Sequence, residues 1–474
     1  MITTVDFYNK LENEDIFTNE NFDLIDQVLT INHLKSNWVT FENCTFNCRS
    51  LEFKNMINED IVLNFDHCTF NCSVTFQNCS LESIEFKNTK VLQSLTVRRL
   101  TLIDFVFLNE SEFEKSKLCT NFNISKTKVT HFQFEKIEHV QGSFKFLGNK
   151  LSEKRGKTSF QNSTLTNVLF SENSFLGFSS FKRMYFKSTA ENSKPIGAAF
   201  EFPGFYKNIF SKVSFSESNF MNTFQFENCD FLDTTWFEEC KNLGNSELKF
   251  VSCKFEKYSL FDSSKFDKIE ILHCKFLEKA SFENFETNYF KLHQVTFAGA
   301  AYFDDLNKTN NKVIENWDRK TLRSIKRELV NTHNQIDYLR FKAYELKAYK
   351  KEVDKSNLRW KDSLILKLGE DSNNFGLDWT KGISFILKWS FFFYALYIVW
   401  YAFYINDANC NPTIEEFLVN YLKFLNPFSF LKSPIEDAEN YFLPFLFFIL
   451  GKIFVSYGIY QTIQAFRKFG VNGG

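Results

Sequence analysis

The sequence predicts a mixed fold class: an N-terminal β-solenoid, a helical hairpin that acts as a connector, and a C-terminal domain of two transmembrane helices. Three observations predict it. A bulky apolar residue recurs at every fifth position through the first three hundred or so residues, the period then becomes helical, and two long apolar stretches follow. A five-residue period fits neither an α-helix nor an isolated strand. It fits a coil with four short sides, each of which turns one large side chain inward.

The repeat is clearest as a six-residue phrase built around phenylalanine. The phrase reads Phe-Glu-Asn-Cys-Thr-Phe at 41–46, Phe-Asp-His-Cys-Thr-Phe at 65–70 and Phe-Glu-Asn-Cys-Asp-Phe at 226–231. Four five-residue units make a coil of about 20 residues. We therefore expect residues 1–37 to form an N-terminal cap and residues 38–303 to form a rod of about a dozen coils, spaced about 4.8 Å apart.

The repeat also accounts for the unusual composition of 62 Phe and 11 Cys in 474 residues. The pairs Cys44/Cys48 and Cys68/Cys72 raise the possibility of a zinc site. A Cys-x3-Cys spacing within a β-coil is a poor tetrahedral clip, however, and the second pair repeats the first one coil later. We therefore predict a ladder of buried thiols, and a structural role for His67 and His273, which also occupy repeat positions.

Composition and motifs exclude several classes of function. The net charge of −1 indicates neither a nucleic-acid partner nor an acidic one. The sequence contains no Ser-His-Asp arrangement, Walker loop, His-Glu-x-x-His motif or dinucleotide fingerprint. We predict a protein that is not an enzyme, without cofactor, metal or nucleic acid. Met1–Asp15 is polar and acidic and not a signal peptide, so we expect a cytosolic N-terminal region with reduced thiols.

The five-residue pattern resembles that of the pentapeptide-repeat proteins, and this resemblance implies a right-handed quadrilateral β-helix. The chain departs from the commonest form of that family, because Cys or Ser replaces Ala at the small position and Phe replaces Leu at the centre. The regularity fails near 97–158 and 182–212. We expect Leu147–Lys157 and Tyr185–Asn208, the latter with Pro195 and Pro203, to be loops that leave the coil.

A helical connector is predicted over residues 312–368. Apolar residues keep helical spacing on both sides of a polar turn at Asn331–Asn334, first at Leu322, Ile325 and Leu329 and then from Ile336 to Ala348. The second half resembles a connector of membrane-attached pentapeptide-repeat proteins, and such hairpins also resemble tetratricopeptide units.

Two acidic residues of the connector, Asp337 and Glu345, are candidates for a functional role or for capping and salt bridges. Its lysines could contact anionic head groups or simply form a solvated face. These lysines are Lys342, Lys347, Lys350, Lys351 and Lys355.

A transmembrane domain is predicted over residues 383–463. The stretches 383–405 and 441–463 each contain 23 residues and one charge, Lys388 and Lys452 respectively, and each exceeds the roughly 20 residues that cross a bilayer. Basic flanks place the solenoid and the C-terminus in the cytoplasm and the loop 406–440 outside.

Segments beside the two spans carry a further resemblance. The sequences Ser372–Gly376 and Tyr460–Arg467 look like the tail of bacterial pentapeptide-repeat membrane proteins. This resemblance implies a multi-pass protein of the bacterial inner membrane.

The loop between the spans is itself apolar on both sides of Asn426-Pro427. It could be an interfacial helix or a re-entrant segment. Span, re-entrant segment and span is the plan of two-helix cation channels, although the potassium filter Thr-Val-Gly-Tyr-Gly is absent.

Lys452 is the most unusual residue of the chain. It is twelfth of the 23 residues of its span, and a lysine at the bilayer centre costs about 3 kcal/mol. Neither span contains an acid to pair with it. A ring of Lys452 side chains in an oligomer could line an anion-permissive pore, or the side chain could snorkel to the surface as Lys388 can.

The predicted function is that of a membrane-anchored protein whose solenoid senses or docks an unknown cytoplasmic protein or small-molecule trigger. The connector would control an oligomeric two-span domain, which is channel-like or permeabilises the lipid bilayer. Bacterial immune effectors use this general arrangement. The alternative is a static scaffold, in which the spans only anchor the rod. An enzyme with a site on the irregular coils is the weakest hypothesis.

Overall fold

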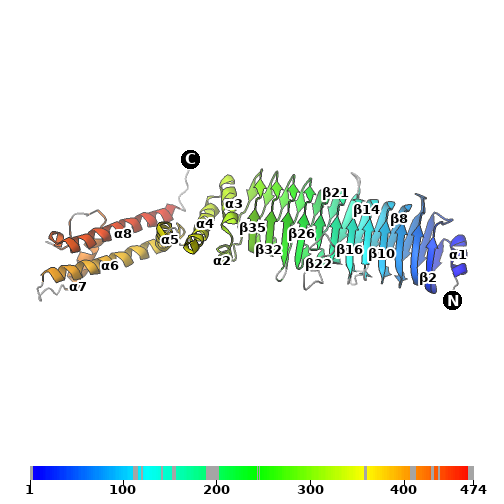
Figure 1. The fold of residues 1–474 in the computed structure, drawn as a ribbon, viewed down its shortest axis with the longest axis horizontal. Coiled ribbons are helices and arrows are strands. Elements are labelled where there is room, and N and C mark those ends of the chain that lie inside the picture. Colours follow the sequence, from blue (N-terminus) through cyan, green and yellow to red (C-terminus); the bar gives the residue numbers. More distant parts are fainter. Residues whose placement is uncertain are drawn as a thin grey trace. The chain divides into compact units, whose positions relative to one another are not determined.

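The computed structural model describes residues 4–109, 116–118, 121–139, 142–151, 156–187, 202–242, 244, 246–356, 360–405, 413–428, 432–435 and 438–467. The chain divides into two compact units, Met1–Thr321 and Leu322–Gly474. The first unit contains the solenoid and the second contains the long helices (Figure 1).

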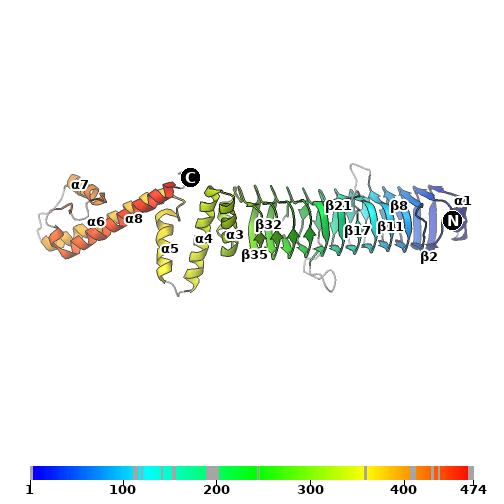
Figure 2. The same cartoon turned by 90° about the horizontal axis from the view of Figure 1, so that it is seen from above.

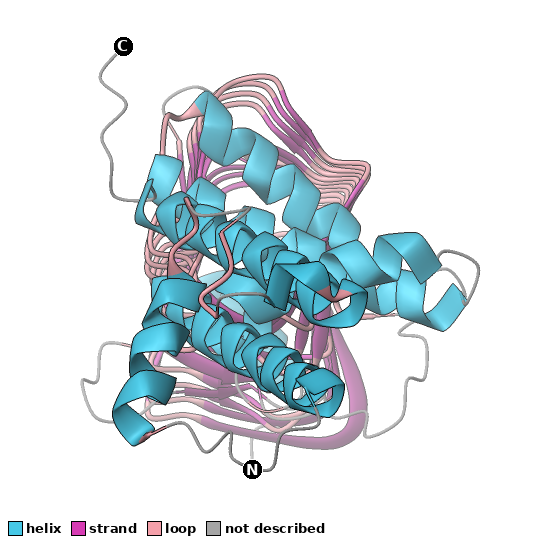
Figure 3. Ribbon diagram, turned by 90° about the vertical axis from the view of Figure 1, so that its left-hand side faces the viewer, coloured by secondary structure: helices cyan, strands magenta, loops and turns pink. Residues whose placement is uncertain are grey.

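The first unit is a parallel β-solenoid of about 12 turns. A regular coil takes 21 residues, as the pairing of Val62 with Ser83 and of Lys265 with Glu286 shows. Successive strands stack in Figure 1, and Figure 3, which looks along the solenoid, shows neighbouring coils almost superposed. Each coil thus repeats the path of the one before it, as the five-residue period predicted.

The described strands form two sheets that share the sides of the coil. The first sheet contains β1 (Ile16–Thr18), β3 (Trp38–Glu42), β5 (Val62–Asp66), β8 (Ser80–Lys87), β11 (Thr101–Leu108), β14 (Lys128–Glu135), β17 (Lys150–Leu151), β18 (Lys157–Gln161), β21 (Ser174–Ser180), β24 (Ile209–Ser214), β27 (Asp230–Phe231), β28 (Thr235–Trp236), β30 (Lys254–Phe255), β31 (Ser259–Leu260), β33 (Lys275–Phe276), β34 (Ala280–Ser281), β36 (Thr296–Phe297) and β37 (Ala301–Tyr302). The second contains β2 (Asn21–Ile31), β4 (Thr45–Lys54), β6 (Thr69–Phe70), β7 (Ser73–Gln77), β9 (Lys90–Val91), β10 (Ser94–Arg98), β12 (Ser116–Leu118), β13 (Asn121–Ser125), β15 (Ile137–His139), β16 (Ser143–Leu147), β19 (Thr164–Thr166), β20 (Val168–Ser171), β22 (Tyr185–Lys187), β23 (Gly204–Tyr206), β25 (Asn219–Phe220), β26 (Thr223–Glu227), β29 (Glu247–Val251), β32 (Lys265–Leu272) and β35 (Glu286–His293).

Many corners of the coil use a residue with left-handed backbone geometry. The third residue of the phrase takes this role, with φ of 53° at Asn43, 52° at His67, 52° at Asn228 and 57° at His273. Asn and His tolerate this region better than most residues that have a side chain. The two histidines are exposed at these corners, which gives them the structural role that the repeat predicted.

Stacked phenylalanine rings fill the core of the solenoid. Phe41 stacks on Phe65 with ring centroids 5.2 Å apart, and Phe255 stacks on Phe276 at 4.5 Å. The next coil presents the same side chain at the same place, so each ring is sandwiched between equivalents. The high Phe content is therefore a packing requirement.

Small residues that follow the corners form ladders between coils. The Cys68 thiol donates to the Phe41 carbonyl at 3.3 Å, one coil earlier. Its hydrogen bond with Cys44 and its burial raise the pKa of this thiol. All nine cysteines in the described part of the chain are buried and free, which confirms the thiol ladder. Cys44 and Cys68 follow strands of the first sheet and Cys253 follows the second, so the cysteines belong to separate ladders.

The boundaries of the solenoid differ in part from those expected. Helix α1 (Thr4–Asn13) covers the first coil, where Phe7 meets Phe22 with ring centroids 5.1 Å apart. Because β1 pairs with β3 and β2 with β4, the solenoid begins at Ile16, within the range 1–37 assigned to the cap. It ends at β37, as expected for a boundary at 303.

The two expected loops are shorter than predicted. The range Leu147–Lys157 contains β17, and Tyr185–Asn208 contains β22 and β23. Residues 152–155 and 188–201, with Pro195, lie outside the described residues. The spacing between equivalent residues of neighbouring coils rises to 35 between Asn173 and Asn208, compared with 21 in a regular coil. The chain therefore has an insertion at this coil.

The connector has the predicted hairpin form. After α2 (Asn311–Ile314), helix α3 (Arg319–Asn331) and helix α4 (Gln335–Ser356) are joined by a tight turn, and α5 (Trp360–Asn373) follows. Leu322, Ile325 and Leu329 are fully buried as expected, whereas Ile336 is 63% exposed. Ile336 occupies the first turn of α4, and so the inward series starts later than the spacing suggested.

Two long apolar helices, α6 (Trp379–Ile405) and α8 (Phe442–Phe466), run antiparallel. Between them come α7 (Ile414–Leu425) and the 3₁₀ turn η1 (Ala438–Asn440). Windows of mean hydropathy 1.6 and 1.9 make α6 and α8 long and apolar enough to cross a membrane. Gly382 and Gly458 allow close approach, because a Cβ there would lie 2.2 Å from Thr462 and 2.5 Å from Ile386.

Candidate functional site

Helix α7 packs against the middle of α6 and α8 rather than beside their ends. Its N-terminus is fixed by a capping box between Thr413 and Glu416. The Tyr394 hydroxyl of α6 donates to the Phe417 carbonyl at 3.0 Å. One turn further along α7, the Tyr421 hydroxyl lies 2.8 Å from the Ser390 hydroxyl. The loop between the apolar helices therefore returns to their centre.

A glycine on α8 makes room for this return. Phe424 of α7 is fully buried against Gly451, and a Cβ on that glycine would lie 2.3 Å from the Phe424 ring. The same ring lies 5.7 Å from the Phe448 ring, centroid to centroid. An apolar anchor thus holds the last turn of α7 between the two long helices.

Lys452 lies directly beneath that last turn and is fully buried. Its ammonium donates to the Asn426 carbonyl at 2.5 Å and to the Lys423 carbonyl at 3.2 Å. The Asn426 carbonyl is that of the C-cap residue of α7, and the Lys423 carbonyl lies in the last turn, where it also accepts the Asn426 N–H at 3.3 Å. Helix ends leave such oxygens short of intrahelical partners. The Lys452 side chain thus caps α7 from a different helix.

The electrostatics of this contact favour a cation. The C-terminal end of a helix carries about half an elementary negative charge, and the ammonium group is placed against it. The ammonium also lies 5.0 Å from the Phe448 ring centroid and 5.8 Å from the Phe424 centroid, which adds attraction to the ring faces. Carbonyl oxygens and ring faces therefore take the place of the acidic partner that neither span provides.

The other site residues predicted in this domain divide into two groups. Asn426 and Pro427, singled out as a break in the loop, end α7, and Asn426 is its C-cap residue. The structure brings Asn426 into contact with Lys452, which the sequence left separate. Lys388 is exposed on the surface of α6. Because Lys452 has no exposed surface, its side chain lies inside a single chain and not on a surface that several copies could share.

A second polar contact joins the end of α5 to α8. Asn373, the last residue of α5, is 1% exposed and donates to the Gln461 carbonyl at 3.1 Å and to the Gln461 side chain at 2.6 Å. Its own side-chain oxygen accepts the N–H of Gly376 at 2.9 Å. These residues belong to the two segments, Ser372–Gly376 and Tyr460–Arg467, that stood out in the sequence.

The connector carboxylates both make structural contacts. Asp337 pairs with Arg340 at 3.1 Å near the start of α4. Glu345 binds Arg323 at 2.9 Å and Lys326 at 2.5 Å, which joins α4 to α3. Burial alone would raise the pKa of Glu345, but the bonds from Lys326 and Arg323 outweigh it and hold the pKa below its usual value.

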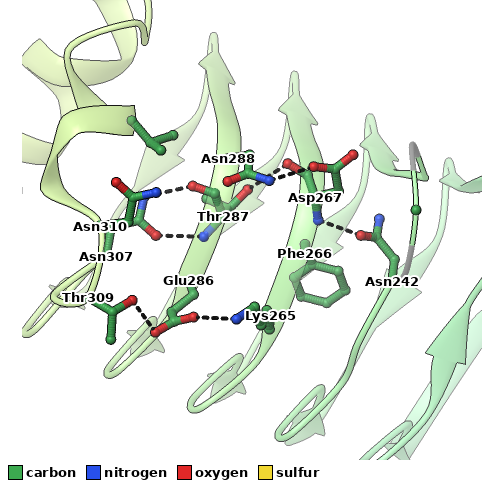
Figure 4. A pocket seen from close by; sticks show the side chains of 12 residues that line it. Asn242, Lys265, Phe266, Asp267, Glu286, Thr287, Asn288, Asn307, Thr309 and Asn310 are labelled. Carbon is green, nitrogen blue, oxygen red and sulfur yellow. Dashed lines mark hydrogen bonds and ion pairs between the residues drawn. The ribbon is translucent and has the colours of Figure 1, made fainter.

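The solenoid surface has a polar hollow of about 480 Å³ near its last coils (Figure 4). Its side chains largely bond to one another. Asn307 donates to the Thr287 carbonyl at 2.6 Å, and Glu286 contacts both Lys265 at 3.0 Å and Thr309 at 2.7 Å. The hollow is thus a place where successive coils are joined by side chains.

Within the described part of the chain, no group of three or more His, Cys, Asp or Glu lies close enough to hold a metal ion. Comparison with known proteins finds no matching family model, curated protein or solved structure. The arguments for function therefore rest on the geometry of this chain.

The sequence identified the residues of this site but not their partners. Lys452 stood out because a charge interrupts an apolar stretch, and Asn426-Pro427 because it breaks a helix. Nothing in side-chain type shows which backbone carbonyl a lysine will meet. Gly451 was the available signal, since a glycine beside a buried charge in an apolar helix marks a close approach of another element.

Proposed function

We propose that this chain is a non-enzymatic, membrane-anchored protein of the bacterial pentapeptide-repeat type, located in the inner membrane. In this proposal the cytoplasmic solenoid senses or docks a trigger and controls an oligomeric two-span domain that conducts ions or permeabilises the bilayer. The order of solenoid, hairpin and two apolar helices supports it. A role as a defence effector is one biological setting for such a device.

The observation that carries the proposal is the contact of Lys452 with the end of α7. If α6 and α8 cross the bilayer, their middle lies in its core, and α7 is then a re-entrant helix. An ammonium at that depth costs about 3 kcal/mol, and here it is placed to hold the end of the re-entrant helix.

The solenoid could act on the clamp through contacts within the second unit. Lys350 of α4 binds Glu370 of α5 at 2.5 Å. Asn373 at the end of α5 then binds Gln461 of α8, the helix that also contains Lys452. In this mechanism a shift of the hairpin displaces α8 relative to α7, and the re-entrant helices of several copies rearrange around a common path.

Ion or dye flux from liposomes tests the proposal. We expect the full chain to release a trapped dye, either when oligomerised or with a cytoplasmic trigger, and Lys452→Leu to abolish release while it still inserts. Lys388→Leu is the matched control: it removes the other span lysine, which is exposed on α6, and should leave flux intact. No flux from any assembly of the unmodified chain would remove the pore proposal.

A static scaffold is the second candidate, and one observation favours it. Lys452 is satisfied within a single chain, so the two apolar helices need no other copy to bury their charge. A scaffold would recruit its partner equally well after Lys452→Leu. Unchanged recruitment of a partner to the membrane by that variant would therefore favour the anchor over the channel.

A further inference from the structure

We propose that α5 is an interfacial helix that lies on the cytoplasmic surface of the bilayer, with its apolar face against the lipid. This inference rests on the proposed membrane insertion of α6 and α8. Its occupant is the headgroup and upper acyl-chain layer of the membrane that those helices cross.

One face of α5 is fixed to the neighbouring helix α4. The Ser363 hydroxyl donates to Asp354 at 2.6 Å, and Glu370 binds Lys350 at 2.5 Å. Leu366 is 8% exposed on the same side. Residues 363, 366 and 370 follow helical spacing, so they define one stripe along α5.

The opposite face is apolar and uncovered within the single chain. Trp360, Leu364 and Ile365 are 69%, 51% and 66% exposed. The spacing of four residues places Leu364 near Trp360, and Ile365 lies about 100° further round the helix, so the three residues span an arc of about 140° on the side away from the stripe that meets α4. Three large apolar side chains in 14 residues form a patch that water does not favour.

The orientation of α5 matches a membrane surface. In Figure 2, α5 runs crosswise to α6 and α8 and lies between α4 and that pair. A helix perpendicular to the spans and placed at their base lies in the plane of the bilayer. The side turned away from α4 is the side turned toward the spans, and thus toward the lipid that would surround them.

The polar residues within and beside the apolar arc of α5 suit the same surface. Lys361 lies within this arc, between Leu364 and Ile365, and Lys367 lies at its edge. Both are exposed, and their ammonium groups extend to headgroup phosphates. Lys361 also lies over the Trp360 ring, 5.7 Å from its centroid, and tryptophan is the residue most typical of the interface. Asp362 and Asp371 on the same helix offset the charge of the two lysines. We therefore expect the apolar face of α5, and not attraction to anionic lipids, to drive its binding to the membrane.

The position of α5 also bears on whether the lysines of α4 contact lipid head groups or form a solvated face. Lys350 of α4 is engaged with Glu370, and α4 is separated from the spans by α5 (Figure 2). Helix α5, and not the lysine-rich face of α4, is therefore the surface that meets lipid.

Quenching of a fluorescent label by brominated lipids tests this inference. The full chain, with Cys119 and Cys410 replaced by serine, would carry one added cysteine through Ile365→Cys, Lys342→Cys or Val399→Cys. The nine other cysteines are buried, so the added one takes the label in the folded chain before reconstitution in phosphatidylcholine vesicles. We expect the label at 365 to be quenched at least about two-fold more than that at 342, and more by bromine near the headgroups than by bromine at the chain ends. The label at 399, on an exposed position of α6, reports insertion of the span.

The outcomes separate the two proposals. A quenched label at 399 with an unquenched label at 365 overturns the interfacial helix and leaves insertion standing. Cross-linking of residue 365 to a second copy or to a bound protein has the same consequence, because that protein and not lipid then covers this face of α5. No quenching at 399 overturns both. Quenching at 365 in a protein that shows no flux supports the interfacial helix and removes only the channel.

Discussion

The two units of this protein satisfy their buried polar groups in opposite ways. In the solenoid many buried groups meet a group one coil away, as Asn149, Asn173 and Asn208 do in a ladder of hydrogen bonds. In the helical unit buried groups meet partners of a different kind that are distant in sequence, as Lys452 meets Asn426 and Asn373 meets Gln461. Repetition makes a single rung of the solenoid dispensable, whereas each contact of the helical unit is unique. Functional sensitivity should therefore concentrate in the helical unit.

The largest effect on stability is expected where a substitution in the solenoid disturbs the stacking itself instead of one rung. A Cβ on Gly204 would lie 1.9 Å from the Gln225 carbonyl oxygen of the next coil. Backbone on both sides cannot move without separating the coils, so we expect Gly204→Ala to cost about 3 kcal/mol of unfolding free energy, measured by urea denaturation of the full chain.

The control for Gly204 is a glycine with free space around it. Gly148 has φ of +62° and no heavy atom within 4 Å of an added Cβ. Gly148→Asn keeps a residue that tolerates this backbone and should change stability by less than about 0.5 kcal/mol. Equal losses for the two variants would contradict the close stacking at Gly204.

A smaller but still clear effect is expected for the ion pairs that Glu345 makes in the connector. Glu345→Gln removes charge from the contacts with Arg323 and Lys326 and should weaken the α3–α4 pair by about 2 kcal/mol. Hydrogen exchange of the α3 and α4 amides measures the loss. Lys342→Gln, an exposed position on the same helix, is the control and should have little effect.

The pH dependence of this ion pair has a definite sign. The pKa of Glu345 is lowered, so its contribution is complete above the ordinary value of 4.5 and is lost as the pH falls through the lowered pKa. Burial raises the pKa of Glu328 on α3, and that carboxyl acts in the opposite direction. The measurement is therefore made in a Glu328→Gln background, where protection that does not fall on acidification would contradict the ion pair.

The smallest effect is expected for one rung of a solenoid ladder. Cys253 donates to the Phe226 carbonyl at 3.4 Å, and serine keeps a small donor at that place. Cys253→Ser should change the unfolding free energy by less than about 1 kcal/mol. Burial also raises the pKa of this thiol, so it should react with a thiol reagent only after unfolding. Rapid labelling of the folded chain would show that the ladder is open.

The same contrast decides how much the sequence could predict. The solenoid was predictable because its information repeats: a bulky residue, usually Phe, at every fifth position gives the coil. The left-handed corners at Asn43 and His67 were not predicted. The two apolar helices were predictable from the length of the two apolar stretches in the sequence. The position of α7 was not, because it depends on Phe424 finding Gly451 and on an ammonium finding backbone oxygens, and neither contact leaves a periodic signal. The start of the solenoid at Ile16 was missed because the first coil lacks the phrase.

The depth of α7 in the bilayer is the measurement that tests the central claim most directly. Leu422, 65% exposed on α7, can carry a spin label as Leu422→Cys in vesicles, and its collision rates with oxygen and with a water-soluble nickel complex report its depth. The clamp predicts a deep label in the unmodified chain and in Lys388→Leu, and a label that moves toward water in Lys452→Leu. A label at the same depth in all three, or one at the water surface throughout, would contradict the proposal that Lys452 holds a re-entrant helix within the membrane.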